Sequence, residues 1–198
     1  MGSLLQARTE IGGRTGGTMT KDAGAITPYP IVQMCWVVDD MDTAALQWVK
    51  TMGAGPFFRI PHIQLDELTY RGKPATLDQS SAVGQWGTVQ VELFQQHCNN
   101  PSGAREMFAP GQSGIQHLTW FANDLDAETR RLNAMGFDTV MTCRLPMIGG
   151  MRLAWYDTRK VLGAMVEVYE ESELLRRFYS RVAKAAEGWI GENPVRSL

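Results

Sequence analysis

An internal repeat constrains the fold of this chain more than any other feature. The segment at residues 31–48 reads IVQMCWVVDDMDTAALQW, and the segment at residues 114–132 reads GIQHLTWFANDLDAETRRL. The two align at an offset of 84 residues, which places Gln33 over His117. Self-similarity at a fixed offset indicates two copies of one supersecondary unit.

The turn after each first strand is acidic and precedes an amphipathic pattern that is typical of a helix. Asp42 and Asp126 are expected to cap these helices, because a carboxylate accepts hydrogen bonds from the free N–H groups of the first turn. Gly53 and Gly136 mark the expected helix ends, where glycine tolerates the left-handed backbone conformation.

Strand patterns complete each half. Each half closes with a strand that carries a glutamate among apolar neighbours, VQVELF in the first half and AMVEVY in the second. The order strand, helix, strand, strand, strand therefore occurs twice, which predicts an α+β fold of two βαβββ modules in a pseudo-twofold pair of curved sheets. The other expected strands lie at residues 57–63, 76–83, 139–144 and 151–156.

Composition sets the expected boundaries. Residues 1–28 contain six glycines and no periodic apolar pattern, so we expect a flexible leader there. The first module is expected at residues 29–108 and the second at residues 109–170. Residues 171–198 are expected to form a C-terminal amphipathic helix and a tail. The expected apolar face of that helix consists of Leu174, Leu175, Phe178 and Val182.

Charge, hydropathy and cysteine content exclude some classes of partner and indicate a cellular location. The 19 Lys and Arg against 21 Asp and Glu give a net charge of −2, which argues against a nucleic-acid partner. No apolar run approaches the roughly 18 residues that a spanning helix needs, so no membrane partner is expected. The N-terminus lacks the apolar core of a signal peptide, and the three cysteines show no disulfide framework. A cytoplasmic location is therefore expected.

Four polar side chains occupy equivalent positions in the two halves. Glu92 and Glu167 lie in the closing strands, and Gln33 and His117 lie in the opening strands. Burying an unpaired carboxylate costs several kcal/mol, so two at equivalent positions require a common partner. A divalent cation would supply that partner, with the imidazole and the amide oxygen as further ligands. A hydrogen-bonded core histidine with solvent-facing glutamates is the alternative interpretation.

The chain resembles the vicinal oxygen chelate superfamily, which includes glyoxalase I, methylmalonyl-CoA epimerase, extradiol dioxygenases and bleomycin resistance proteins. The stretches that resemble its first module are QMCWVVDDMDTAALQWVKTMGAGPFF and VQVELF, and those that resemble its second are GIQHLTWFANDLDAE and YDTRKVLGAMVEVYE. The resemblance covers about residues 31–170 and implies paired βαβββ modules that form a cup-shaped mixed sheet around a metal. The superfamily's ligand positions fall on Gln33, Glu92, His117 and Glu167.

The resemblance also implies a chemistry. The Gln/Glu/His/Glu set resembles the metal shell of animal glyoxalase I and lies close to that of the epimerases. Three oxygen ligands and one nitrogen suit Zn, Mn, Co, Ni or Mg better than iron. By resemblance, Glu167 would be the principal base and Glu92 its counterpart in moving a proton alpha to a carbonyl of a small molecule, through a metal-stabilised enolate. We therefore expect an isomerase, an epimerase or a glyoxalase-type lyase.

Two other functions stay open at this point. One is a ring-cleaving-type dioxygenase, and the other is a non-catalytic small-molecule binding or resistance protein, because a fold does not decide a function. Relatives often dimerise, which implies a homodimer. Substrate contacts are expected from two polar loops and from residues that share a strand face with the ligands. The expected substrate contacts are Arg152, Tyr70, Cys35 and Thr119.

Overall fold

The structure is a computed structural model that describes residues 25–198. Most of the expected leader, residues 1–24, lies outside the described residues. The part of the leader that is described contacts the second module. The Arg131 guanidinium donates to the carbonyl oxygens of Ala25 and Ile26, at 3.0 and 2.6 Å.

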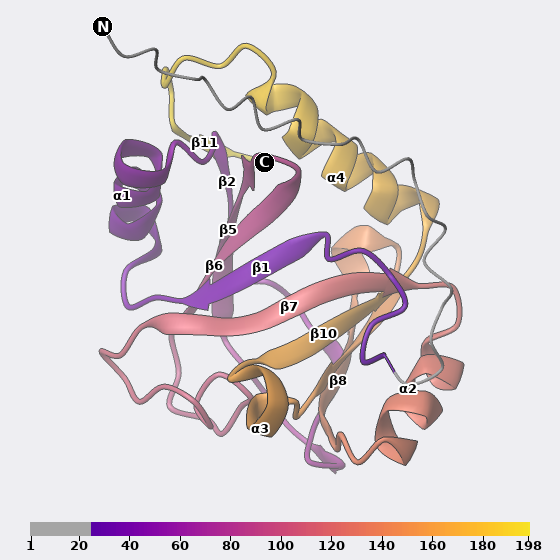
Figure 1. Cartoon of the computed structure of the whole chain (residues 1–198). Coiled ribbons are helices and arrows are strands. Elements are labelled where there is room, and N and C mark those ends of the chain that lie inside the picture. Colours follow the sequence, from indigo (N-terminus) through magenta and orange to yellow (C-terminus); the bar gives the residue numbers. More distant parts are fainter. Residues whose placement is uncertain (1–24) are drawn as a thin grey trace, which may run out of the picture.

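The strands of the described residues form one mixed sheet of 11 strands, in the order β11-β2-β5-β6-β1-β7-β10-β9-β8-β3-β4 (Figure 1). The strands of the first half are β1 (Gln33–Val37), β2 (Phe57–Ile60), β5 (Gln79–Trp86) and β6 (Val89–Gln96). Those of the second half are β7 (Gly114–Ala122), β8 (Thr139–Leu145), β9 (Met151–Tyr156) and β10 (Met165–Glu170). The helices are α1 (Met41–Met52), α2 (Leu125–Ala134), α3 (Arg159–Leu162) and α4 (Glu173–Ala186), with a 3₁₀ turn, η1, at Pro146–Ile148.

The repeat is visible in the strand order. Read outward from the centre, the first half runs β1-β6-β5-β2 and the second half runs β7-β10-β9-β8. In each half the opening strand pairs in parallel with the closing strand, and the antiparallel β1–β7 pair joins the halves. The structure therefore confirms the predicted α+β fold with a C-terminal helix, and it places the four strands that carry the expected ligands at the centre of the sheet.

Helices cover both faces of the sheet. Residues of α1 and α2 pack against one face, which we call the outer face, through clusters built around Leu93 and Trp120. The opposite, inner face carries Cys35 and Trp155, and Leu175 of α4 packs into the same cluster. Leu174, expected on the apolar side of α4, is 52% exposed. The helix α4 thus covers the inner face, on which the candidate site lies. No helix of the described residues is long and apolar enough to cross a membrane.

The helix caps lie two residues earlier than the sequence analysis placed them. Asp40 and Asp124 are the N-caps of α1 and α2, and their carboxylates accept backbone N–H bonds at 2.7 and 2.8 Å. Asp42 and Asp126 lie in the first turns instead. The reason is packing, because the residue after each cap is apolar and buried as the first residue of its helix. Gly53 caps α1 in the left-handed conformation, as predicted, whereas Met135, one residue before Gly136, is the C-cap of α2.

Asp124 offers a test of this cap assignment. We expect Asp124→Ala to lower the free energy of unfolding by about 1 kcal/mol, because an orphaned backbone N–H group loses its acceptor. Asp124→Asn keeps a capping oxygen and is expected to stay within a few tenths of a kcal/mol of the wild type. Urea denaturation measures both. An equal loss in the two variants would show that charge, and not the cap hydrogen bond, is what matters.

Two edge segments differ from the expected pattern. The short strands β3 (Asp66–Tyr70) and β4 (Lys73–Pro74) belong to the first module in sequence, but β3 pairs with β8 of the second. The expected tail contains β11 (Val195–Ser197), which pairs in parallel with β2. These strands are short and half-exposed, so they lack the alternating pattern by which longer strands are recognised.

Candidate functional site

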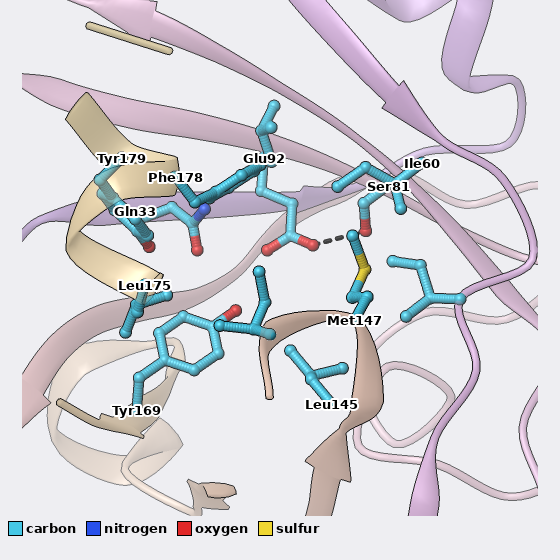
Figure 2. Close-up of a pocket in the computed structure, with 13 residues that line it drawn as sticks. Gln33, Ile60, Ser81, Glu92, Leu145, Met147, Tyr169, Leu175, Phe178 and Tyr179 are labelled. Atoms are coloured by element: carbon cyan, nitrogen blue, oxygen red, sulfur yellow. Dashed lines mark hydrogen bonds between the residues drawn. The ribbon is translucent and has the colours of Figure 1, made fainter. Parts of the chain in front are cut away.

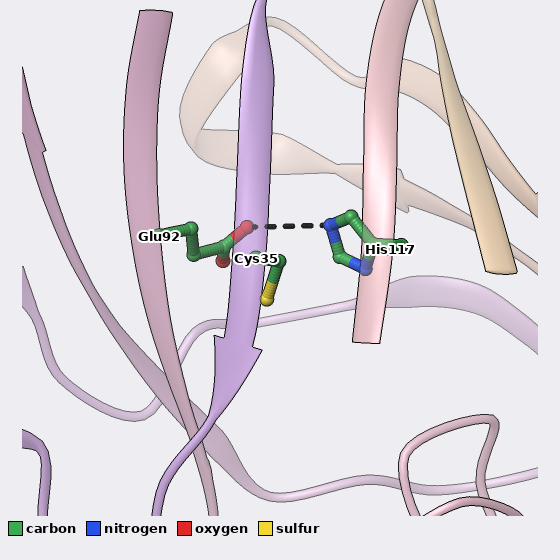
Figure 3. A group of neighbouring side chains, drawn as sticks. All are labelled: Cys35, Glu92 and His117. Carbon is green, nitrogen blue, oxygen red and sulfur yellow. Dashed lines mark ion pairs between the residues drawn. The ribbon is translucent and has the colours of Figure 1, made fainter. Parts of the chain in front are cut away.

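One row of side chains on the inner face consists of Glu92, Cys35 and His117. Cys35 lies opposite Glu92 in the parallel β1–β6 pair and opposite His117 in the antiparallel β1–β7 pair. One potential ligand atom from each residue lies within 4.8 Å of the other two, and all three residues are buried (Figure 3). Cys35, expected as a substrate contact, is therefore a direct neighbour of two expected metal ligands.

The adjacent row contains Gln33, Thr119 and Glu167. Gln33 lies opposite Thr119, and Thr119 lies opposite Glu167. The Thr119 hydroxyl donates to Glu167 Oε2 at 3.2 Å and lies 3.5 Å from Gln33 Oε1. The Gln33 amide nitrogen donates to Gln90 Oε1 at 3.2 Å, which leaves the amide oxygen on the side of Thr119. Thr119 thus connects two of the expected ligands.

His117 is the point at which the two rows meet. Its Nε2 atom lies 3.0 Å from Glu167 Oε2 and 3.7 Å from Glu92 Oε2. Its Nδ1 atom is hydrogen-bonded to the side-chain oxygen of Gln116, and this bond fixes the orientation of the ring. Nε2 is fully buried and has no hydrogen bond of good geometry to any described residue. A ring held through one nitrogen, with the other nitrogen free and facing carboxylates, is the usual arrangement of a metal-ligating histidine.

Each carboxylate is held by its other oxygen. Glu167 Oε1 accepts a hydrogen bond from the indole N–H of Trp155 at 2.7 Å. Glu92 Oε1 accepts one from the hydroxyl of Ser81 at 2.5 Å. Both Oε2 atoms therefore remain directed at His117. The sequence analysis indicated neither Trp155 nor Ser81 as a site residue.

The buried ionisable groups of the site have shifted pKa values. Burial lowers the pKa of His117, but the neighbouring Cys35 and Glu167 outweigh this and raise that pKa well above 6.5. Burial raises the pKa of Glu167, but the charge of His117 and the hydrogen bond from Trp155 lower it below its ordinary value. Burial also raises the pKa of the Cys35 thiol to about 12.

The residues fit a divalent cation. Glu167 and Glu92 are buried, and among the described residues neither forms an ion pair with a lysine or an arginine. Two carboxylates against one imidazole leave net negative charge even when His117 is protonated. A divalent ion would balance that charge and replace the His117 proton, as metals generally do on binding.

Two small cavities, of about 50 Å³ each, meet at Glu92 and Tyr169. The first is lined by Gln33 and Glu92 of the sheet, by Met147 of η1 and by Tyr179 of α4 (Figure 2). The second is lined by Trp155 and Glu167 as well as Glu92. Because Met147 belongs to η1, this turn lies beside the first cavity.

Tyr179 of α4 is a site residue that sequence reasoning missed. Its hydroxyl oxygen is buried, has no hydrogen-bond partner among the described residues, and belongs to a side chain that lines the first cavity. Helical spacing indicated an amphipathic helix over these residues, but not that the helix would close the cup. A buried hydroxyl without a partner is costly, so it is ready to bond a molecule in the cavity.

None of the four expected substrate contacts lines either cavity; Cys35 and Thr119 lie in the rows of the buried site, whereas Arg152 and Tyr70 lie away from it. Arg152 forms ion pairs with Glu170 at 2.5 Å and Asp126 at 2.9 Å, and it shares its strand face with residues that pack against α2. Strand alternation therefore directs it to the outer face, which corrects the expectation drawn from its loop. The Tyr70 hydroxyl donates to Glu106 Oε1 at 2.9 Å and lines neither cavity.

Paired βαβββ modules around a cluster of buried donors define a vicinal oxygen chelate fold. The sequence matches the family model of the Glyoxalase/Bleomycin resistance protein/Dioxygenase superfamily over residues 32–154, and the chain belongs to this superfamily. The predicted resemblance is thus confirmed.

Solved structures show the same fold at low identity. Methylmalonyl-CoA epimerase from Mycobacterium tuberculosis is 19% identical with a TM-score of 0.52, and the match covers 80% of this chain and 97% of that one. The hypothetical protein BH1468 from Bacillus halodurans C-125 is 14% identical with a TM-score of 0.50, over 73% and 95% of the two chains. No curated protein matches the sequence.

Proposed function

We propose that this protein is a metal-dependent enzyme that transfers a proton on the carbon alpha to a carbonyl of a small organic substrate. The reaction would be that of an isomerase, an epimerase or a glyoxalase-type lyase. One observation carries the proposal. Glu92 and Glu167 each direct a carboxylate oxygen at the buried Nε2 atom of His117, which forms no hydrogen bond of good geometry with a described residue, and small cavities lie beside this site.

The proposed ligands are Gln33, Glu92, His117 and Glu167, and Cys35 offers a further donor between Glu92 and His117. The bound ion would be Zn²⁺ or one of Mn²⁺, Co²⁺, Ni²⁺ and Mg²⁺. Such an ion polarises a carbonyl and stabilises the negative charge of an enolate.

Glu167 is proposed as the principal base. Trp155 and Thr119 fix its carboxylate, and the surrounding strands exclude water from it. Glu92 lies on the other side of His117 and faces both cavities. Two carboxylates in this arrangement can remove a proton with one group and return it with the other, which an epimerase requires.

The inner face also supplies contacts for a substrate. The Tyr179 hydroxyl is proposed to donate a hydrogen bond to a substrate oxygen in the first cavity. Most other groups around that cavity are apolar, which keeps water away from the reacting carbon. Because each cavity holds only about 50 Å³, a substrate would have to displace α4 or η1 on entry.

Metal analysis and isotope exchange together test this function. Protein purified without added metal is expected to contain Zn, Mn, Co or Ni, and to exchange the alpha proton of a bound carbonyl compound with deuterated solvent. Methylmalonyl-CoA and the glutathione adduct of methylglyoxal are suitable first substrates. Iron together with oxygen uptake would replace the proposal with a dioxygenase, and tight binding of an apolar molecule without metal or exchange would indicate a binding protein.

A further inference from the structure

A second group of metal-ligand side chains lies on the surface of the first module. His62 follows β2, Asp78 precedes β5, and His97 follows β6. One potential ligand atom from each lies within 4.8 Å of the other two, and all three residues are exposed. The chain has three histidines, so those that do not lie at the buried site lie together here. We call these three residues the rim cluster.

Hydrogen bonds orient the side chains of the rim cluster. His62 Nδ1 lies 2.7 Å from Asp78 Oδ1, and His97 Nε2 lies 2.7 Å from the hydroxyl of Ser80. The backbone N–H of His62 also donates to that hydroxyl, at 2.9 Å. His62 Nε2 and His97 Nδ1 are left without a hydrogen-bond partner among the described residues. Ser80 thus holds the His97 ring through Nε2 and leaves Nδ1 free, while His62 Nδ1 already faces the Asp78 carboxylate that would share the ion.

The spacing of the rings favours a shared ligand over two separate surface histidines. The ring centroids of His62 and His97 are 4.7 Å apart, with an interplanar angle of 32°. Two imidazole rings at that distance, beside a carboxylate, can bind one cation together. An ordinary exposed ion pair between His62 and Asp78 would contribute little to stability and would not require His97.

We propose that His62, Asp78 and His97 form a second metal site, for a divalent transition ion such as Zn²⁺. Two imidazole nitrogens and one carboxylate oxygen suit Zn²⁺, Ni²⁺ or Cu²⁺, and are a poor set for Mg²⁺ or Ca²⁺, which prefer oxygen ligands. The site lies at the rim of the cavities, because Ile63, the next residue after His62, lines both. It shares no ligand with the buried site.

Zn²⁺ titration of the full chain by calorimetry tests the rim cluster. We expect His62→Ala and His97→Ala each to remove one equivalent of bound Zn²⁺, and Asp78→Asn to weaken that equivalent tenfold or more. Asp66→Asn, at another exposed aspartate, is the matched control and is expected to bind as the wild type does. The ring signals of His62 and His97 in ¹H–¹⁵N spectra should shift on adding Zn²⁺ and stay unchanged on adding Mg²⁺.

The two metal sites are separable in this experiment. If the buried site binds no metal, the wild type still takes up one equivalent, and the rim variants abolish it. If only the buried site exists, the three rim variants bind Zn²⁺ with the stoichiometry and affinity of the wild type, and the rim proposal is overturned. All three substituted side chains are exposed, so these variants are expected to fold.

Discussion

Glu167→Gln is expected to slow exchange of the substrate's alpha proton with deuterated solvent by about 10²–10⁴-fold, the usual contribution of a general base. Glutamine has the same shape, and its single amide oxygen can stay directed at the metal, while its NH2 group takes the place of the oxygen that accepts the hydrogen bond from Trp155. The variant thus keeps a neutral oxygen ligand, but it cannot take up the proton. The variant should therefore retain much of its metal while losing exchange, as followed by NMR and by metal analysis of the same sample.

Glu92→Gln is the matched comparison for this prediction. Its effect should be mild in a lyase-type reaction and as severe as that of Glu167→Gln in an epimerase, which needs a proton donor on the opposite face of the substrate. Exchange at the wild-type rate in Glu167→Gln would show that Glu167 is only a ligand, and the proposed mechanism would be wrong.

His117→Ala is expected to have the largest effect on the metal. Loss of a partner that only orients a ligand weakens metal affinity about 10–100-fold, so loss of the ligand itself should exceed that range. The same change leaves Glu167 and Glu92 buried without a cation, which should lower the unfolding free energy of the metal-free protein by about 3–5 kcal/mol. Calorimetry with Zn²⁺ and urea denaturation with a chelator present measure the two effects.

The pH dependence of the stability of the metal-free protein distinguishes loss of the His117–Glu167 ion pair from loss of packing around the substituted side chain. Because the pKa of His117 is raised in the folded state, its contribution to stability is complete below about pH 6.5 and is lost as the pH rises through the folded-state pKa. The lowered pKa of Glu167 acts in the opposite sense, so its contribution is lost as the pH falls below its ordinary range. His117→Ala should remove the alkaline loss, and a pH profile unchanged from the wild type would contradict the ion pair.

Most of the fold could be predicted from the sequence, because the repeat and the strand alternation are patterns among residues that are near each other in the chain. The 84-residue offset paired Gln33 with His117, and both side chains lie on the inner face. Alternation determines on which face of the sheet a side chain lies, but not which residues lie opposite each other on neighbouring strands. For that reason the position of Cys35 between Glu92 and His117 became visible only from the register.

The contacts that could not be predicted depend on tertiary packing and on strand register. Tyr179 reaches the cavity because α4 crosses the inner face, which helical periodicity does not specify. Trp155 and Ser81 bond the carboxylates of Glu167 and Glu92 from the neighbouring strands β9 and β5, and no motif marks either residue. Arg152 was misplaced because its loop position was given more weight than its place in the alternation of β9.

Crystallography of the protein soaked with Zn²⁺, with anomalous scattering recorded at the zinc edge, tests the buried metal centre most directly. We expect an anomalous peak about 2.0–2.2 Å from His117 Nε2 and from carboxylate oxygens of Glu92 and Glu167, the normal Zn–N and Zn–O distances. Gln33 or Cys35 should complete the ligands. A crystal at saturating Zn²⁺ without a peak there, in which His117 Nε2 still lies against Glu167 Oε2, would contradict the metal centre and the enolate chemistry that depends on it.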